Sequence, residues 1–278
     1  MKLGLIGHHI QKSRSPELHV WLGKHNKQET TYELFDCELE NEAALLELLL
    51  ELKAKGYRGV NVTHPYKVWA WNLIQNKERT DKTLGALNTV VLNKDELVGM
   101  NSDCTGFKRA YQDHFAQQAP KKVLLKGAGG VGRAIAFGLA QLNVEHIYIF
   151  DSFKDSQQAL IDDLTAIGVS ASGIDESQIK SCSKECEGLV NATPVGHYAT
   201  PGASYTAEEI FSPKWIFDAV YTPVETEFVQ LAQQKQAEVI SGYELFTNQG
   251  IDAYEMFVGH DIDSTGVYDA VPIDGPKA

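Results

Sequence analysis

Short apolar runs alternate with longer amphipathic segments along the first hundred residues. Residues 2–7, 31–39 and 59–64 are short and mostly apolar or alternating, which predicts strands. Between the last two, residues 40–56 begin with acidic side chains, carry leucines at helical spacing, and end with lysines and Gly56, as a helix with a glycine stop does. The pattern therefore predicts a β-α-β unit.

The same alternation continues in the rest of the chain. Residues 88–101 read as two short strands about a polar turn, and a helix follows from about Asp103 to Phe115. After a polar joint at 117–122, strands and helices alternate again to about Val239. The tail at 243–259 has a helical pattern and no strand to pair with, so we expect it to pack on one of the two units. The chain is therefore predicted to be α/β, with two domains.

Composition and charge exclude several classes of protein. The 278 residues are 43% apolar, enough for a proper core in each domain. No apolar run is long enough to span a bilayer and no signal-peptide pattern is present, so we expect a cytoplasmic protein. A net charge of −12 disfavours nucleic acid and anionic membranes as partners. The four cysteines are scattered, so neither a disulfide framework nor a metal site is expected.

A glycine-rich turn opens the second series of strands and helices. The sequence GAGGVG fits G-x-G-x-x-G, directly follows an apolar strand and opens a helix. The first glycine would allow the tight turn, the second would let backbone N–H groups approach a pyrophosphate, and the third would let the helix pack on the strand. A glycine turn that serves packing alone is the alternative. The predicted phosphate-binding residues are Gly127, Ala128, Gly129, Gly130, Val131 and Gly132.

An aspartate at the end of the next apolar run bears on the choice of cofactor. Asp151 follows the glycine turn at about the 20-residue distance of a dinucleotide fold. A carboxylate there accepts hydrogen bonds from the ribose hydroxyls of NAD, whereas the 2′-phosphate of NADP would meet a like charge. The neighbouring residues include no arginine, and Lys154 is the one nearby cation. NAD is therefore favoured over NADP, with a solvated loop acid as the alternative for Asp151.

The first unit carries polar residues at the ends of its predicted strands. Ser13 and Ser15 lie on a loop after the first strand, Lys67 lies past a later strand, and Asp103 follows another. Each has a structural alternative: the serines could cap a helix, Lys67 could be a surface charge, and Asp103 could be a helix N-cap. Their convergence at one edge of a sheet is the functional hypothesis.

Several motifs, in one order along nearly the whole chain, connect these residues. They are SRSPELH (13–19), NVTHPYK (61–67), GALNT (85–89), GMNSD (99–103), GAGGVG (127–132), NATPVG (191–196), DAVYTPVET (218–226) and GYELFTNQ (242–249). In this set and order the chain resembles the shikimate/quinate dehydrogenase family. Motifs in register are far more specific than any one of them alone.

The resemblance implies a domain plan and roles for individual residues. Residues 1–104 and 241–278 would form the substrate-binding and catalytic domain, and 105–240 an NAD-binding Rossmann domain. Lys67 and Asp103 would be the catalytic pair. The implied substrate-binding residues are Ser13 and Ser15 for the carboxylate, Thr63, Asn88 and Gln249 for ring hydroxyls, and Tyr221 nearby. The further cofactor residues implied are Thr193, Val220 and Gly242.

The implied activity is NAD-dependent oxidation of a ring hydroxyl of shikimate, quinate or both to the 3-dehydro ketone. The sequence FDSF at 150–153 stands where NADP-using members carry Asn-Arg-Thr, and Lys12 and Ser102 also depart from the family pattern. Shikimate, quinate and an amino-shikimate stay open as substrates, as do biosynthetic and catabolic roles and a monomer or homodimer. An NADP-dependent biosynthetic enzyme, a non-catalytic NAD-binding sensor and a different oxidoreductase are the alternatives.

Overall fold

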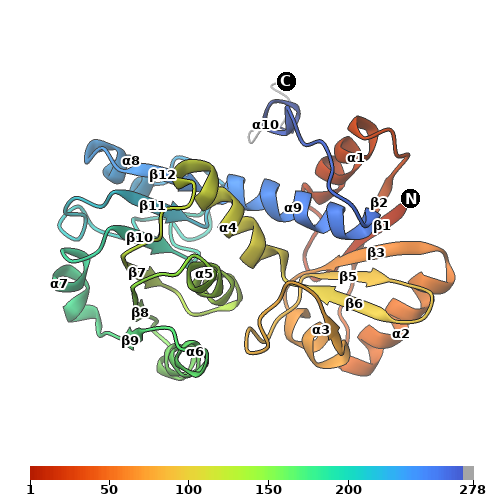
Figure 1. The fold of residues 1–278 in the computed structure, drawn as a ribbon, viewed down its shortest axis with the longest axis horizontal. Coiled ribbons are helices and arrows are strands. Elements are labelled where there is room, and N and C mark those ends of the chain that lie inside the picture. The colour runs from red at the N-terminus through yellow and green to blue at the C-terminus, as the bar shows by residue number, and fades with distance from the viewer. Residues whose placement is uncertain (272–278) are drawn as a thin grey trace. The chain divides into compact units, whose positions relative to one another are not determined.

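The computed structural model describes residues 1–271, and the chain divides into two compact units (Figure 1). Unit 1 comprises Met1–Gly106 together with the chain from Thr247 onward, and unit 2 comprises Phe107–Phe246. Two helices, α4 (Ser102–Phe115) and α9 (Gly242–Val258), contribute residues to both units. The unit boundaries therefore lie inside helices rather than in linkers.

Unit 1 is built on a mixed sheet of six strands in the order β2-β1-β3-β5-β6-β4. The strands are β1 (Lys2–Gly7), β2 (Thr31–Asp36), β3 (Tyr57–Val62), β4 (Asn76–Lys77), β5 (Thr89–Leu92) and β6 (Leu97–Met100). β1 pairs in parallel with β2 and β3, whereas β5 is antiparallel to both β3 and β6. The two-residue β4, parallel to β6, was not predicted because it is too short to show a period.

Helices cover both faces of this sheet (Figure 1). The helices are α1 (Ser15–His25), α2 (Glu42–Ala54), α3 (Lys67–Leu73) and, near the end of the described chain, α10 (Val267–Ala270). α2 and α3 pack on one face, and α1 and the unit 1 part of α9 on the other. Leu45, Leu49 and Leu52 of α2 are almost fully buried against β3. Burial of each leucine contributes about 2 kcal/mol to the free energy of unfolding. The helical leucine spacing in the sequence predicted this buried face correctly.

Unit 2 is built on an entirely parallel sheet of six strands in the order β12-β11-β10-β7-β8-β9. The strands are β7 (Lys122–Lys126), β8 (His146–Phe150), β9 (Ala171–Gly173), β10 (Gly188–Asn191), β11 (Trp215–Asp218) and β12 (Glu238–Ser241). The strand order reverses between β7 and β10, which is the arrangement of a doubly wound dinucleotide-binding fold. In such folds the ligand lies at the carboxyl ends of the strands beside this reversal.

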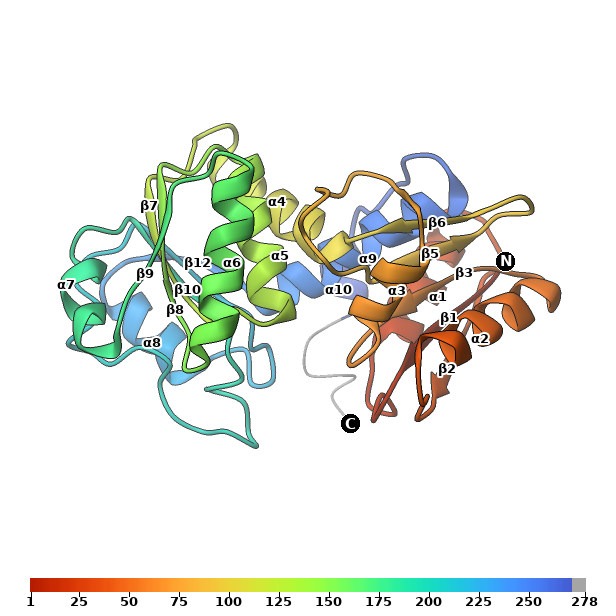
Figure 2. The same ribbon diagram turned by 90° about the horizontal axis from the view of Figure 1, so that it is seen from below.

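Helices also cover both faces of the unit 2 sheet (Figure 2). They are α5 (Gly130–Gln141), α6 (Lys154–Ala166), α7 (Ile179–Ser183) and α8 (Glu227–Gln234), with a 3₁₀ turn at Glu176–Gln178. α5 and α6 lie on one face, and α7 and α8 on the other. Leu124, Leu189 and Ile216 on the central strands are fully buried. Within residues 1–271, no helix is both long and apolar enough to cross a membrane.

Candidate active site

The lysine and the aspartate singled out in the sequence form an ion pair in unit 1. Lys67 begins α3 and Asp103 lies in the first turn of α4, with Lys67 Nζ 2.6 Å from Asp103 Oδ2. Their side chains are only 20% and 12% exposed. The N-terminus of α4 is capped instead by Asn101, whose Oδ1 accepts from the backbone N–H of Cys104. Lys67 is therefore not an unpaired surface charge, and Asp103 is not the N-cap residue of α4.

The two serines of the first loop lie against each other. Ser13 Oγ donates to Ser15 Oγ at 3.1 Å, and the backbone N–H of Ser15 points to Ser13 Oγ at 3.3 Å. The N-cap position of α1 is Arg14, and no side chain caps this helix. Neither serine therefore occupies the N-cap position, and the two hydroxyls lie together as a pair. Lys12, one residue earlier, is exposed.

Two of the residues assigned to ring hydroxyls meet at one serine. Ser102 Oγ lies 3.1 Å from Asn88 Oδ1 and 3.3 Å from Gln249 Oε1, so it links the end of one loop to α9. Thr63 directly follows β3, and its backbone N–H donates to Ile6 on the neighbouring strand. The structure therefore gathers the predicted substrate residues of unit 1 around the carboxyl ends of its strands and the starts of α3 and α4.

The glycine turn in unit 2 leaves room at the N-terminus of α5. Gly127 has a φ of +101°, which disfavours residues with a side chain. A Cβ on Gly132 would lie 1.9 Å from the carbonyl oxygen of Gly127, so α5 approaches the turn as closely as glycine allows. Gly129 and Gly130 have no atom within 4 Å of an added Cβ. Unbonded N–H groups at a helix start, with open space before them, suit a phosphate group.

Asp151 is bonded to the same glycine turn. Its Oδ2 accepts from the backbone N–H of Ala128 at 2.6 Å, and its Oδ1 from Phe153 at 2.8 Å. The carboxylate is therefore held at the end of β8 rather than solvated on a loop. Lys154 does not neutralise it, because Lys154 Nζ binds Asp175 Oδ1 at 2.9 Å and the carbonyl oxygen of Ile174.

A buried pair at the ends of β10 and β11 holds the loops that carry Thr193 and Val220. Thr193 Oγ1 donates to Asn191 Oδ1 at 2.6 Å, and Val220 N–H donates to Asp218 Oδ1 at 3.0 Å. Asn191 Nδ2 also donates to Asp218 at 2.8 Å, so the two loops share one anchor. Burial raises the pKa of Asp218, and hydrogen bonds from Thr226, Val220 and Asn191 oppose that shift.

Gly242 and Tyr221 complete the predicted set in unit 2. A Cβ on Gly242 would lie 2.4 Å from the carbonyl oxygen of Ala219, so this glycine permits the start of α9 to approach the end of β11. The ring of Tyr221 is half-buried and stacks on Phe246, with 5.7 Å between ring centroids. Tyr221 thus belongs to unit 2, whereas the other predicted substrate residues belong to unit 1.

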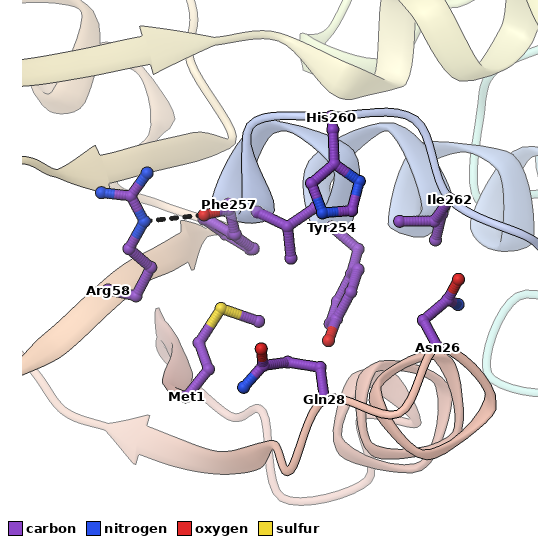
Figure 3. Close-up of a pocket in the computed structure, with 9 residues that line it drawn as sticks. Met1, Asn26, Gln28, Arg58, Tyr254, Phe257, His260 and Ile262 are labelled. Carbon is purple, nitrogen blue, oxygen red and sulfur yellow. Dashed lines mark hydrogen bonds between the residues drawn. The ribbon is translucent and has the colours of Figure 1, made fainter.

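A pocket of about 430 Å³ lies at the end of the unit 1 sheet away from Lys67 and Asp103 (Figure 3). Arg58 at the start of β3 lines it, whereas Thr63 follows the end of β3, a separation of about 16 Å along the strand. Arg58 donates to the carbonyl oxygen of Phe257 at 2.7 Å and to Asn93 at 2.6 Å. Because its bonds join β3 to α9 and to the β5–β6 turn, this arginine serves the fold, and the pocket is not the catalytic one.

Comparison with known proteins agrees with the geometry. The model of the shikimate dehydrogenase substrate binding domain matches residues 5–90. A quinate/shikimate dehydrogenase (NAD(+)) of Corynebacterium efficiens is 34% identical over 90% of each chain. The chain belongs to the shikimate/quinate dehydrogenase family. The resemblance seen in the sequence motifs is thereby confirmed, and the protein is an oxidoreductase of a family that acts on CH–OH groups.

Solved structures of the family share the whole fold. Quinate dehydrogenase from Corynebacterium glutamicum in complex with NAD is 30% identical, covers 99% of this chain and 98% of its own, and has a TM-score of 0.89. Shikimate 5-dehydrogenase from Thermus thermophilus in complex with NADP(H) and shikimate is 29% identical, covers 98% of each chain and has a TM-score of 0.84. The predicted two-domain α/β fold is therefore confirmed.

Some site residues of this dehydrogenase were not singled out in the sequence. Asn61 and Thr89 lie inside the recognised motifs and bond to Asn88 from behind, and Asn191 and Asp218 begin two further motifs. One sequence signal was present for Asn61, which is a polar residue between valines in an otherwise apolar strand. A buried amide needs partners, so its position in a central strand pointed to a network.

Proposed function

We propose that the protein oxidises a ring hydroxyl of quinate, shikimate or both to the 3-dehydro ketone, by reversible hydride transfer to NAD. The observation that carries this proposal is the Lys67–Asp103 ion pair, in the same unit as the serine pair and the Asn88–Ser102–Gln249 cluster. Paired hydroxyls suit a carboxylate, and amide groups suit ring hydroxyls. The NAD-dependent quinate/shikimate relatives agree with this assignment.

The residues of unit 2 fit NAD. The open space at Gly129 and Gly130 lies before the N-terminus of α5, where a pyrophosphate would be held by backbone N–H groups. The Asp151 carboxylate at the end of β8 would accept from ribose hydroxyls and would repel a 2′-phosphate. With Lys154 engaged by Asp175, no cation in this stretch offsets that repulsion.

Proton transfer falls to the chain's own side chains. When bound, NAD would supply the nicotinamide that accepts the hydride from the carbinol carbon. In oxidation Lys67, as the neutral amine, would take the proton of the reacting hydroxyl and become an ammonium, and in reduction that ammonium would stabilise the developing alkoxide and return the proton to it. Asp103, 2.6 Å away, orients Lys67 and can accept from a neighbouring substrate hydroxyl. Ser13 and Ser15 would bind the carboxylate and so set which ring hydroxyl meets Lys67.

The first experiment is kcat/KM for quinate and for shikimate, each with NAD and with NADP, followed by absorbance of the reduced nicotinamide. We expect turnover chiefly with NAD, and the better acid names the substrate. An amino-shikimate is assayed beside them because the sequence leaves it open. A preference for NADP, or no turnover of any of these acids, would refute the proposal.

Replacement of Lys67 tests the mechanism directly. We expect Lys67→Ala to lower kcat by about 10²- to 10⁴-fold, the usual value of general acid–base catalysis, with NAD affinity unchanged. Lys94→Ala, an exposed lysine in the β5–β6 turn, is the matched control. Thermal unfolding of both variants verifies that they fold. Near-wild-type kcat in a folded Lys67→Ala variant would remove Lys67 from catalysis.

The assignments beyond the chemistry stay predictions from the sequence. These are a cytoplasmic location, and a monomeric or homodimeric state that gel filtration with light scattering measures. The bounds of the substrate and nucleotide domains, which the sequence puts at 104/105 and 240/241, also belong here.

A further inference from the structure

A continuous network of buried polar groups lies behind Asn88 in unit 1. Its members come from β2, β3, β5, α4 and the segment between β4 and β5, and all are at most 9% exposed: Tyr32, Asn61, Asn88, Thr89 and Ser102. Thr89 and Ser102 are fully buried, so they cannot act on a substrate from the surface. Because buried polar groups are retained only when they are hydrogen-bonded, the directions of these bonds carry information.

The amide of Asn88 is held in one orientation. Its Oδ1 lies 2.7 Å from the backbone N–H of Ser102, 3.1 Å from Ser102 Oγ and 3.1 Å from Thr89 Oγ1. A backbone N–H can only donate, so the atom facing it must be the amide oxygen. That oxygen is surrounded by donors, whereas Asn88 Nδ2 donates to no acceptor within residues 1–271. The amide nitrogen is therefore the group left for a ligand.

Asn61 sets the direction of the bond from Thr89. Asn61 Nδ2 donates to the carbonyl oxygen of Asn88 at 3.2 Å and to Thr89 Oγ1 at 3.1 Å. A carbonyl oxygen can only accept, so this amide is also unambiguous, and its Oδ1 accepts from Tyr32 Oη at 2.9 Å. Because Thr89 Oγ1 accepts from Asn61, its one proton faces Asn88 Oδ1 at 3.1 Å and Ser102 Oγ at 3.2 Å, and the Ser102 hydroxyl lies against the same Asn88 oxygen.

The network carries no net charge at its far end. The ring of His19 stacks on Tyr32 with 4.6 Å between centroids, and only 1% of His19 is exposed. Burial lowers the pKa of His19 from 6.5 to about 3, and its hydrogen bond to Asn61 opposes that shift only in part. A neutral imidazole packed on Tyr32 keeps the donor of Asn61 Oδ1 in place without a buried charge.

We propose that Thr89 and Asn61 are positioning residues that keep Asn88 turned with Nδ2 toward the substrate, so that Asn88 acts as a hydrogen-bond donor. This inference rests on the proposed function and deepens it. The substrate atom at Asn88 must then be an acceptor, such as a hydroxyl or ketone oxygen. An ammonium group at the same ring position would place donors against donors, so an amino analogue substituted there is disfavoured.

Kinetics of Thr89 variants test the proposal. We expect Thr89→Val, which keeps the shape and removes the hydroxyl, to raise the substrate KM about two- to tenfold, the value of one hydrogen bond, with the KM of NAD unchanged. Thr89→Ser keeps the hydroxyl, so its substrate KM should equal that of the wild type. Thr247→Val is the matched control, because Thr247 is buried in unit 1 and its hydroxyl has no partner within residues 1–271.

A double-mutant cycle separates positioning from a general structural effect. In an Asn88→Ala background, Thr89→Val should have no further effect on the substrate KM, because Thr89 acts through Asn88. An equal rise in KM in both backgrounds, or a parallel rise in the KM of NAD, would overturn the proposal. Turnover of quinate or shikimate by the wild type decides the proposed function separately from these outcomes.

A second readout needs no turnover. The side-chain amide signals of Asn88 in ¹⁵N NMR spectra, assigned with Asn88→Ala, should be shifted or broadened by Thr89→Val and left in place by Thr247→Val. Unchanged Asn88 signals in a folded Thr89→Val variant would contradict the positioning role, whatever the substrate.

Discussion

In the proposed function, the Asp151 carboxylate would serve both the glycine turn and the ligand. It accepts from the backbone N–H groups of Ala128 and Phe153, which keeps the glycine turn next to the end of β8. A carboxylate with two oxygens has further lone pairs, so the same group can accept from ribose hydroxyls. In the proposed function, the specificity for NAD would therefore depend on a residue that also shapes the glycine turn.

We expect Asp151→Ala to raise the KM of NAD about 10- to 100-fold, because hydrogen bonds to a charged acceptor are lost. The KM of NADP should rise less or fall, since the repulsion of the 2′-phosphate is removed. The KM of the cyclic acid should change little. Asp155→Ala, an exposed acid in the first turn of α6, is the control. Full retention of the NAD preference by Asp151→Ala would show that another group selects the cofactor.

At the scale of elements, a histidine joins α4, β12 and α9 within unit 2. His114 Nδ1 lies 2.8 Å from Glu238 Oε1, and Nε2 lies 2.6 Å from Glu244 Oε1. Both ring nitrogens face carboxylates, so the imidazolium is favoured. Glu244 also accepts from the N–H and hydroxyl of Ser241, which ties down the start of α9.

This cluster predicts a pH-dependent stability. The hydrogen bonds to Glu244 and Glu238 raise the pKa of His114 from 6.5 to about 9, although burial opposes the shift. A raised folded-state pKa contributes stability that is complete below about pH 6.5 and is lost as the pH rises through about 9. On the acid side, burial acts to raise the pKa of Glu244, but bonds from His114 and Ser241 lower it overall.

We expect His114→Asn to reduce the free energy of unfolding by about 1–3 kcal/mol at pH 6 and by less at pH 9.5. Denaturant unfolding at several pH values measures this difference. His260→Asn serves as a control, because His260 is exposed and its ring binds only the carbonyl oxygen of Asp261 among the described residues. A His114 effect that is the same at both pH values would exclude the ion pair as its cause.

At the scale of the whole molecule, two helices each carry residues of both units. α4 carries Asp103 in unit 1 and His114 in unit 2, and α9 carries Gly242 in unit 2 and Gln249 in unit 1. On α9, a residue assigned to the cofactor and a residue assigned to the substrate thus lie on the same helix. This helix is therefore a continuous covalent link from one set of residues to the other.

Thermal unfolding with each cofactor tests this level. We expect NAD at about 100 times its Kd to stabilise the folded chain by about 2.7 kcal/mol. NADP at the same concentration should give a much smaller rise in Tm. Adenosine monophosphate at the same concentration controls for ionic effects. Equal stabilisation by NAD and NADP would show that the Asp151 carboxylate does not repel the 2′-phosphate.

Much of the fold was predictable because it depends on local patterns. The leucine spacing of α2, the strands on either side of it, and the glycine turn that opens α5 all show their periods in short windows. Three elements were not assigned from the sequence: the strand β4, of two residues, and the helices α3 and α10, of seven and four residues. Each is too short for a period to appear. Tertiary contacts decide elements of that length.

The candidate site was predictable only as a set of residue types in motifs. Lys67 and Asp103 are 36 positions apart in the chain, and pattern alone left each with a structural alternative. Their 2.6 Å contact arises because α3 and α4 both begin at the same edge of the unit 1 sheet. The polar Asn61 between valines indicated a buried network, but the bonds that Asn61 and Thr89 make to Asn88 could not have been assigned from sequence, since the direction of a hydrogen bond depends on what lies opposite.

The sequence by itself determined the α/β alternation, the dinucleotide motif with Asp151, and the family, because periodicity and motif spacing are properties of nearby residues. Only the tertiary structure decided that the serines of the first loop lie against each other, that Lys154 is engaged by Asp175, and that the amide oxygen of Asn88 faces the backbone N–H of Ser102. The physical reason is that hydrogen bonds and ion pairs act over a few ångströms, and only folding brings distant residues within that range.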